Sequence, residues 1–396
     1  MRARAAVAFA AALAAVFCLG IWLGGHPGKL PAFVQDAFVS EQSSLTAEAA
    51  ELIEDSYYRP VDERQLSNAS LQGMVRELRR RNDDQFSEYF SPQSLEEFNQ
   101  QIEGRFTGIG LSVVPVKRGL RVAEVFPESP AAKAGIVPGD TVVSVDGESI
   151  AGESSTEATA KIKGPEGTEV TVGVLDGRSG EVRQETMTRA EVELPNVSSE
   201  VRQVGDRKLG YVRLLSFSVG AHAQLAEAVE EVQEEGAEGI VLDLRHNPGG
   251  LLDEAVRSAS VFLPEGDVVV RTESRTQGDS VHETSGGNLP ELPTVVLIDR
   301  GTASAAEILT AALADNGDAT VVGTRSFGKG VFQEERDLAN GGALKLTVGE
   351  YFTPDGVNLA ESKGIHPQIV VRDNPRTEPD EALRRALGVL AGQVGG

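Results

Sequence analysis

The stretch TVVLIDRGTASAAEILTAALA, residues 294–314, decides the fold class of this chain. It opens with the apolar run Thr294–Asp299, which is typical of a strand buried on both faces. It continues through Gly301 into Ala305–Ala314, where small and apolar residues of good helix propensity follow one another. A buried strand that leads directly into a helix is the repeating unit of α/β domains.

The same alternation continues on the N-terminal side of this unit. The runs LGYVRL (209–214) and GIVLDL (239–244) have the composition of strands, and Gln224–Glu235 between them has helical spacing. We therefore predict an α/β domain over residues 191–375. The remaining tail, 376–396, is expected to finish in a short helix.

A different pattern precedes this domain. Short β-rich runs separated by turn signals, among them GIGLSVVPV (108–116) and TEVTVGVLDG (168–177), predict a small β domain over residues 104–190. Its first loop places two glycines around one apolar residue, so successive backbone amides can point at a carboxylate. The candidate peptide-binding residues are Gly108, Ile109, Gly110 and Leu111.

Helical spacing marks the region before the β domain. Ala47–Tyr58 and Leu66–Arg81 carry apolar residues at intervals of three and four, so residues 26–103 are predicted to be helical. Ahead of them, Arg2 and Arg4 precede an apolar run of bilayer-spanning length. Residues 1–25 are therefore interpreted as a membrane anchor, with a cleaved signal as the alternative, and everything after them is expected outside the cytoplasm.

The overall composition excludes several classes of protein. The 396 residues include 60 acidic and 37 basic side chains, a net charge of −23, which argues against nucleic acid as a partner. The single cysteine, Cys18, excludes an intramolecular disulfide framework. No cluster of His, Asp and Glu has the spacing of metal ligands, so neither a metal nor an organic cofactor is expected.

Ser304 stands at the predicted turn from strand to helix and has two interpretations. With Glu307 three residues later it matches the S-x-x-E capping box, which requires no catalysis. Alternatively, the helix start exposes the hydroxyl as a nucleophile, and the free amides of the first turn favour a developing oxyanion. A second set of amides for that purpose is offered by Gly249 and Gly250, on the side opposite Ala305.

A nucleophilic serine needs a base, and Lys329 is the best candidate. It lies in SFGKGVFQ (326–333), where flanking glycines allow the backbone to pack closely around one lysine, and burial would lower its pKa. A solvated surface lysine is the alternative. The stretch Gly323–Gly330 also matches G-x-x-x-x-G-K, but it lacks the Ser or Thr that a phosphate loop needs and leads toward a strand, so nucleotide binding is not expected.

Two family resemblances follow from these motifs. SPAAKAGIVPGDTVVSVDGESI (129–150), together with the GIGL loop, resembles a PDZ domain. DLRHNPGG (243–250), DRGTASAAEI (299–308) and VVGTRSFGKGVFQ (321–333) resemble the carboxy-terminal processing peptidases, or tail-specific proteases. These are serine peptidases with a PDZ domain ahead of an α/β core.

The resemblance implies a role for each motif. Ser304 is the nucleophile, Lys329 the general base and Gln333 the residue that orients the lysine. The amides of Gly249 or Gly250, with that of Ala305, form the oxyanion hole. The substrates are proteins or peptides whose free C-terminal tails bind the PDZ domain.

Two other functions remain open at this stage, as do the assembly state and regulation. One is a membrane-anchored PDZ scaffold without catalysis, and the other is a hydrolase that uses a histidine, with His246 the most plausible. Self-association through the helical N-terminal region and a regulatory partner are both compatible with the sequence.

Overall fold

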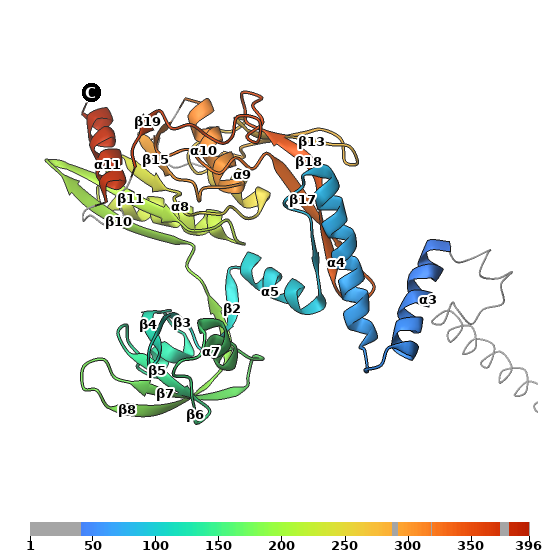
Figure 1. Cartoon of the computed structure of the whole chain (residues 1–396). Helices are drawn as coiled ribbons and strands as arrows, with labels where there is room; N and C mark the ends of the chain where they lie inside the picture. The colour runs from blue at the N-terminus through green and yellow to red at the C-terminus, as the bar shows by residue number, and fades with distance from the viewer. Residues whose placement is uncertain (1–40, 287–291, 318, 373–379, 396) are drawn as a thin grey trace, which may run out of the picture. The chain divides into compact units, whose positions relative to one another are not determined.

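The computed structural model describes residues 41–286, 292–317, 319–372 and 380–395 (Figure 1). The predicted membrane segment, residues 1–25, lies outside them. Among the described residues, no helix is long and apolar enough to cross a bilayer. The chain divides into two compact units, Met1–Ser91 with Arg336–Leu346, and Pro92–Glu335 with Thr347–Gly396.

The first unit contains the two helices that the sequence predicted. Helix α3 runs over Glu41–Ser56 and α4 over Glu63–Asn82. Asp62 caps α4 by accepting a hydrogen bond from the Arg64 amide. The short strand β1 (Glu88–Phe90), which the helical interpretation of 26–103 missed, pairs with residues 343–345 of β18 (Ala343–Phe352). Three residues are too few for a recognisable alternation, so only a partner strand distant in sequence reveals β1.

Helix α5 (Pro92–Ile102) opens the second unit and leads into the predicted β domain. A six-stranded sheet has the order β3-β4-β5-β7-β8, and β6 pairs with β5. Its apolar core includes Leu120, Val142 and Val172. The strands and helices of this domain are β3 (Leu111–Val116), β4 (Gly119–Val125), α6 (Pro130–Lys133), β5 (Thr141–Val145), β6 (Glu148–Ser149), α7 (Ser155–Ile162), β7 (Glu169–Leu175) and β8 (Val182–Thr188).

A two-stranded ribbon connects this β domain to the next. Strand β2 (Arg105–Gly108) pairs antiparallel with β9 (Ala190–Glu193). The two ends of the β domain therefore enter and leave the fold side by side, which is the usual arrangement for a domain inserted into another.

The α/β domain is built on a second six-stranded sheet, of order β10-β11-β12-β15-β16-β19. The pairs from β11 to β19 are parallel, and only β10 is antiparallel to its neighbour. The strands are β10 (Val197–Val204), β11 (Arg207–Leu214), β12 (Ile240–Asp243), β15 (Thr294–Ile298), β16 (Ala319–Gly323) and β19 (Ile369–Val370). The α/β prediction is confirmed.

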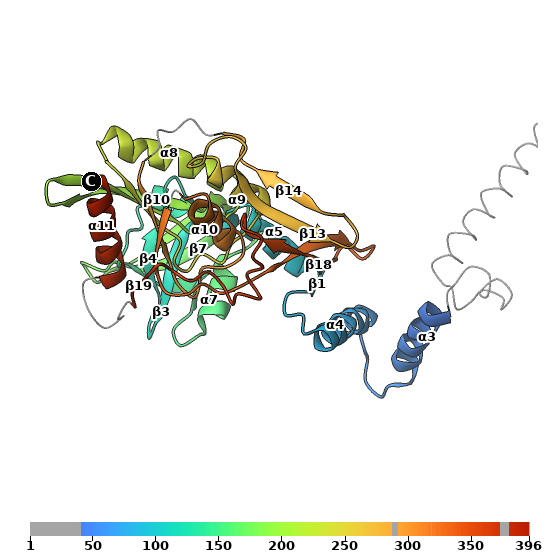
Figure 2. The same ribbon diagram turned by 90° about the horizontal axis from the view of Figure 1, so that it is seen from above.

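Both faces of this sheet are covered by helices (Figure 2). On one face, alternate residues such as Leu242 and Val296 pack against α8 (Ala221–Glu234), α9 (Leu252–Ala259) and α10 (Ala305–Asp315). On the other face, Val241 and Val295 pack with α11 (Glu381–Val394). Helix α11, which lies in the tail set apart as 376–396, is thus part of the core. The sequence did not show this, because the apolar face of a short amphipathic helix does not reveal which surface it packs against.

A smaller antiparallel sheet completes the core. Strand β13 (Val268–Ser274) pairs with β14 (Ser280–Glu283) and with residues 349–352 of β18 (Figure 1). The preceding strand β17 (Val331–Asp337) also pairs with β18. This hairpin begins immediately after Lys329 and returns toward it.

Arg245 docks α11 onto the sheet. Its guanidinium donates to Asp243 at 2.7 Å and to Asp380 at 2.7 Å, and Asp380 also caps α11 by accepting from the Leu383 amide. Burial opposes ionisation of Asp380, but the bonds from Arg245 and Leu383 outweigh it and hold the pKa of this carboxyl below its usual value. A carboxyl with a lowered folded pKa stabilises the protein above its unfolded pKa, and this stabilisation is lost as the pH falls.

We therefore expect Asp380→Asn to lower the melting temperature at pH 7 by a few degrees, since a hydrogen bond to a charged group contributes about 1.5–3 kcal/mol. Thermal denaturation from pH 7 to pH 3 checks this. Between pH 7 and pH 3, the melting temperature of the wild type should fall further than that of the variant. Parallel curves would contradict the docking role.

Candidate active site

The strand order brings three predicted motifs to one edge of the sheet. Strands β12, β15 and β16 are adjacent and parallel, so the loops after their carboxyl ends meet. The loop after β12 carries Gly249 and Gly250, the loop after β15 carries Ser304, and the loop after β16 carries Lys329. Hydrogen bonds join the first two loops, from the Ala303 amide to the Asn247 carbonyl at 3.0 Å and from Thr302 Oγ1 to the Leu244 carbonyl at 2.8 Å.

Ser304 has a backbone conformation that residues other than glycine rarely adopt. Its φ of 55° and ψ of −121° lie outside the ordinary allowed regions, although Ser304 immediately precedes α10. Non-glycine residues persist in such regions only where their surroundings impose them, and they gather at functional sites. The strain therefore favours a functional position for Ser304 over a purely structural one.

Of the two hydrogen bonds of a capping box, the structure contains the one to the Glu307 side chain. The Glu307 carboxylate accepts from the Ser304 amide at 3.0 Å, as a capping box requires. The Glu307 amide, however, donates to the Ser304 backbone carbonyl at 2.8 Å, and the serine hydroxyl makes no capping bond. The hydroxyl is thus not committed to the helix end.

Gly249 and Gly250 differ in what they offer. A side chain at Gly249 would collide with Ala303, Ser304 and Ala305, so only glycine allows this approach, but its amide already donates to Asn247 Oδ1 at 2.9 Å. Gly250 is exposed, and neither its amide nor that of Ala305 has a hydrogen-bond partner among the residues that the structure describes. Of the three amides predicted to form the oxyanion hole, those of Gly250 and Ala305 are therefore the available donors.

Lys329 is partly buried, not fully solvated. Its Nζ donates to Gln333 Oε1 at 2.7 Å, and Gln333 Nε2 donates to Thr347 Oγ1 of β18 at 3.3 Å. Lys329 lies near the end of the loop after β16. Gln333 lies on β17, and its side-chain oxygen accepts the hydrogen bond from the lysine. The residues that the resemblance paired are in contact, and Thr347 is an addition that the sequence did not single out.

Glu307 links the nucleophile loop to the lysine loop. One oxygen of this fully buried carboxylate accepts from the amides of Ser304 and Lys329, both at 3.0 Å. The other accepts from the Gly328 amide at 2.7 Å and from the Ser326 hydroxyl. Burial raises the pKa of Glu307, while these four hydrogen bonds act to lower it. From the sequence, Glu307 is recognisable only as a helix cap, because its contacts with residues 326–329 depend on tertiary structure.

The histidine alternative receives no geometric support. His246 Nδ1 lies 3.0 Å from Asp299 Oδ2, but its side chain is 75% exposed, and no hydrogen bond between His246 and Ser304 is found in the described part of the chain. Asp299 instead orders the loops, since its other oxygen accepts from the amides of His246 and Gly301.

The predicted peptide-binding loop lies in the β domain. The Ile109 side chain is 1% exposed and belongs to the domain core, and the carbonyls of Ile109 and Gly110 accept from the amides of Ala131 and Phe126. The amides of Ile109 and Gly110 have no partner within the described ranges. Strand β3, which starts at Leu111, is an edge strand of its sheet. Amides at the loop and an open edge are the two features that bind an added peptide strand.

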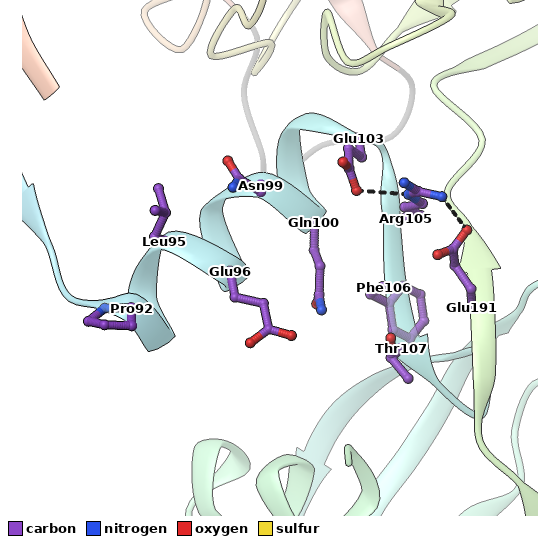
Figure 3. Close-up of a pocket in the computed structure, with 10 residues that line it drawn as sticks. All are labelled: Pro92, Leu95, Glu96, Asn99, Gln100, Glu103, Arg105, Phe106, Thr107 and Glu191. Carbon is purple, nitrogen blue, oxygen red and sulfur yellow. Dashed lines mark hydrogen bonds and ion pairs between the residues drawn. The ribbon is translucent and has the colours of Figure 1, made fainter. Parts of the chain in front are cut away.

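One polar pocket lies apart from these residues (Figure 3). It has a volume of about 350 Å³ between α5 and the β2–β9 ribbon. Arg105 is paired there with Glu103 at 2.8 Å and with Glu191 at 2.6 Å. Since neither Ser304 nor Lys329 lines this pocket, it is not the candidate reaction site.

Most of the chain is similar to known proteins. Residues 208–371 match the model of peptidase family S41, and residues 121–176 match a PDZ domain. A probable CtpA-like serine protease of Staphylococcus aureus (strain COL) is 35% identical over 342 residues, 85% of this chain and 66% of the relative. This chain thus spans slightly less than two thirds of that relative.

Two further relatives extend the comparison. The carboxy-terminal processing protease CtpA of Bacillus subtilis (strain 168) is 33% identical over 321 residues, 81% of this chain and 67% of the relative. The solved structure of a photosystem II D1 C-terminal processing protease has a TM-score of 0.51 and 28% identity, covering 88% of this chain and 98% of that one. The chain therefore belongs to the carboxy-terminal processing proteases of peptidase family S41.

Proposed function

We propose that this protein is a serine endopeptidase that binds substrate proteins by their C-terminal tails and cleaves them with a dyad of Ser304 and Lys329. The observation that carries this proposal is the Glu307 carboxylate, which holds the backbones of both residues at one sheet edge. This link fixes the backbones of Ser304 and Lys329 relative to each other, as a two-residue catalytic unit requires.

Each residue has one part in the mechanism. Neutral Lys329 accepts the proton of Ser304 as Oγ attacks the scissile carbonyl carbon. The amides of Gly250 and Ala305 donate to the oxyanion of the tetrahedral intermediate. Lys329 then protonates the leaving amine, and water hydrolyses the acyl-enzyme. Gln333 holds the lysine in place through Oε1.

The PDZ domain supplies substrate selection in this proposal. The tail carboxylate binds the amides around Ile109 and Gly110, and the tail adds as a strand along the edge of β3. We also propose that residues 1–25 anchor the protein and that the reaction takes place outside the cytoplasm. This rests on Arg2 and Arg4 ahead of the apolar run.

Substrates that differ only at the tail test this function. We expect the purified protein to cut an unfolded protein with an apolar C-terminus at internal bonds. Two aspartates at that C-terminus should lower the initial rate about tenfold, because they disrupt tail binding at the PDZ domain. Electrophoresis and mass spectrometry of the fragments measure both effects.

The same experiment separates the endopeptidase from the scaffold alternative. Tail peptides that bind but are never followed by cleavage would support a scaffold without catalysis. Equal cleavage rates for the apolar and acidic tails would contradict selection by the PDZ domain.

A further inference from the structure

Tyr351 has a buried hydroxyl that the fold does not satisfy. It lies on β18, its side chain is 2% exposed, and its oxygen has no hydrogen-bond partner in the described part of the chain. Buried polar side-chain atoms are hydrogen-bonded in the large majority of cases, so an exception needs an explanation. The backbone holds the residue firmly, since the Tyr351 amide donates to the Gly330 carbonyl at 3.1 Å.

Two polar groups near this hydroxyl, Ser304 and Glu307, belong to the candidate active site. Tyr351 packs in the same apolar cluster as Ala305 and Ala306, the first two residues of α10. The Ser304 hydroxyl is close enough to lower the pKa of Tyr351, although no hydrogen bond of standard geometry joins the two. Burial and the charge of Glu307 dominate and raise that pKa well above 10, so the phenol stays protonated.

We propose that Tyr351 is a positioning residue for the nucleophile, which donates its phenolic hydrogen to a lone pair of Ser304 Oγ. The Tyr351 phenol is a donor without an acceptor, and the neighbouring Ser304 hydroxyl makes no capping bond. Ser304 Oγ can therefore accept the phenolic hydrogen. The bond leaves the proton of Ser304 directed away from Tyr351 and available to Lys329. No proton leaves the tyrosine at any step, so the proton balance of the reaction is unchanged.

The proposal rests on the proposed peptidase function, and it predicts a specific pattern for Tyr351→Phe. This change removes only the oxygen. We expect kcat to fall about 10- to 100-fold with KM within about twofold, since the loss affects the nucleophile and not substrate binding. The rate at which a fluorophosphonate labels Ser304, followed by mass spectrometry, should fall by a similar factor.

Stability separates positioning from a structural role. Ser304 Oγ is the one partner proposed for this hydroxyl, and removing the phenol oxygen also removes the cost of burying it, so the melting temperature of Tyr351→Phe should stay within about one or two degrees of the wild type. Tyr89→Phe is the matched control, because the Tyr89 hydroxyl donates to Asn68 at 2.7 Å and accepts from Asn340 at 3.0 Å. That variant should lose stability and keep the wild-type labelling rate.

Each outcome decides one question. If the wild type neither cleaves nor is labelled, the proposed function fails. If the wild type is active and Tyr351→Phe is labelled equally fast or faster, the positioning role is overturned. A Tyr351→Phe protein that melts at a markedly lower temperature also overturns it, because the hydroxyl would then be structural.

Discussion

Replacing Lys329 by alanine is expected to lower kcat/KM by about 10⁴-fold or more, as the loss of a general base does in other serine peptidases. In the proposed mechanism, loss of the amine leaves Ser304 without a base as it attacks and the leaving amine without a proton donor. The folded structure should remain, because Lys329 is only partly buried. Initial rates on the unfolded substrate, with circular dichroism spectra of each variant, measure this.

Two companion measurements sharpen the test. Ser304→Ala should be equally inactive, and the double variant no worse than either single one, because residues that act as a unit are not additive. The wild-type rate should rise from pH 5 toward neutral and alkaline pH as Lys329 loses its proton. A flat profile from pH 5 to pH 9, or a Lys329→Ala protein with wild-type activity, would exclude lysine as the base.

Glu307→Gln is expected to lower kcat about 100-fold and also to destabilise the protein. The amide group of glutamine has one acceptor oxygen where the carboxylate has two, so in either orientation its NH₂ would face at least one backbone amide that now donates to Glu307. Each buried donor left without an acceptor costs about 1–3 kcal/mol. The neutral glutamine relieves the burial of a charge, and this gain only partly offsets the loss. Steady-state kinetics and thermal denaturation measure the two effects.

The β domain offers a matched control for this substitution. Ser154 and Glu157 form a capping box at the start of α7, and the Glu157 carboxylate accepts from the Ser154 amide at 3.1 Å. Glu157→Gln makes the same chemical change at an exposed helix start, so it should have little effect on the melting temperature and leave kcat unchanged. If the two variants behaved alike, Glu307 would be a helix cap and no more.

Local sequence determined the elements and the candidate chemistry of this protein. Apolar runs and helical spacing predicted β15, α10 and α8 to within a few residues, because burial and propensity act along a short stretch of chain. Glycines flanking Lys329 and following Pro248 marked loops in which the backbone packs closely. The motifs that resembled the peptidase family are local for the same reason.

Only the tertiary structure decided how these motifs meet. The order β12-β15-β16 brings together three loops that are about 55 and 25 residues apart along the chain, and strand order depends on pairing between distant segments. The same pairing buries Glu307 between Ser304 and Lys329 and places Tyr351 beside Ser304. Neither role is visible in the sequence, because a carboxylate or a phenol acquires its function from the groups that surround it, and distant segments supply those groups.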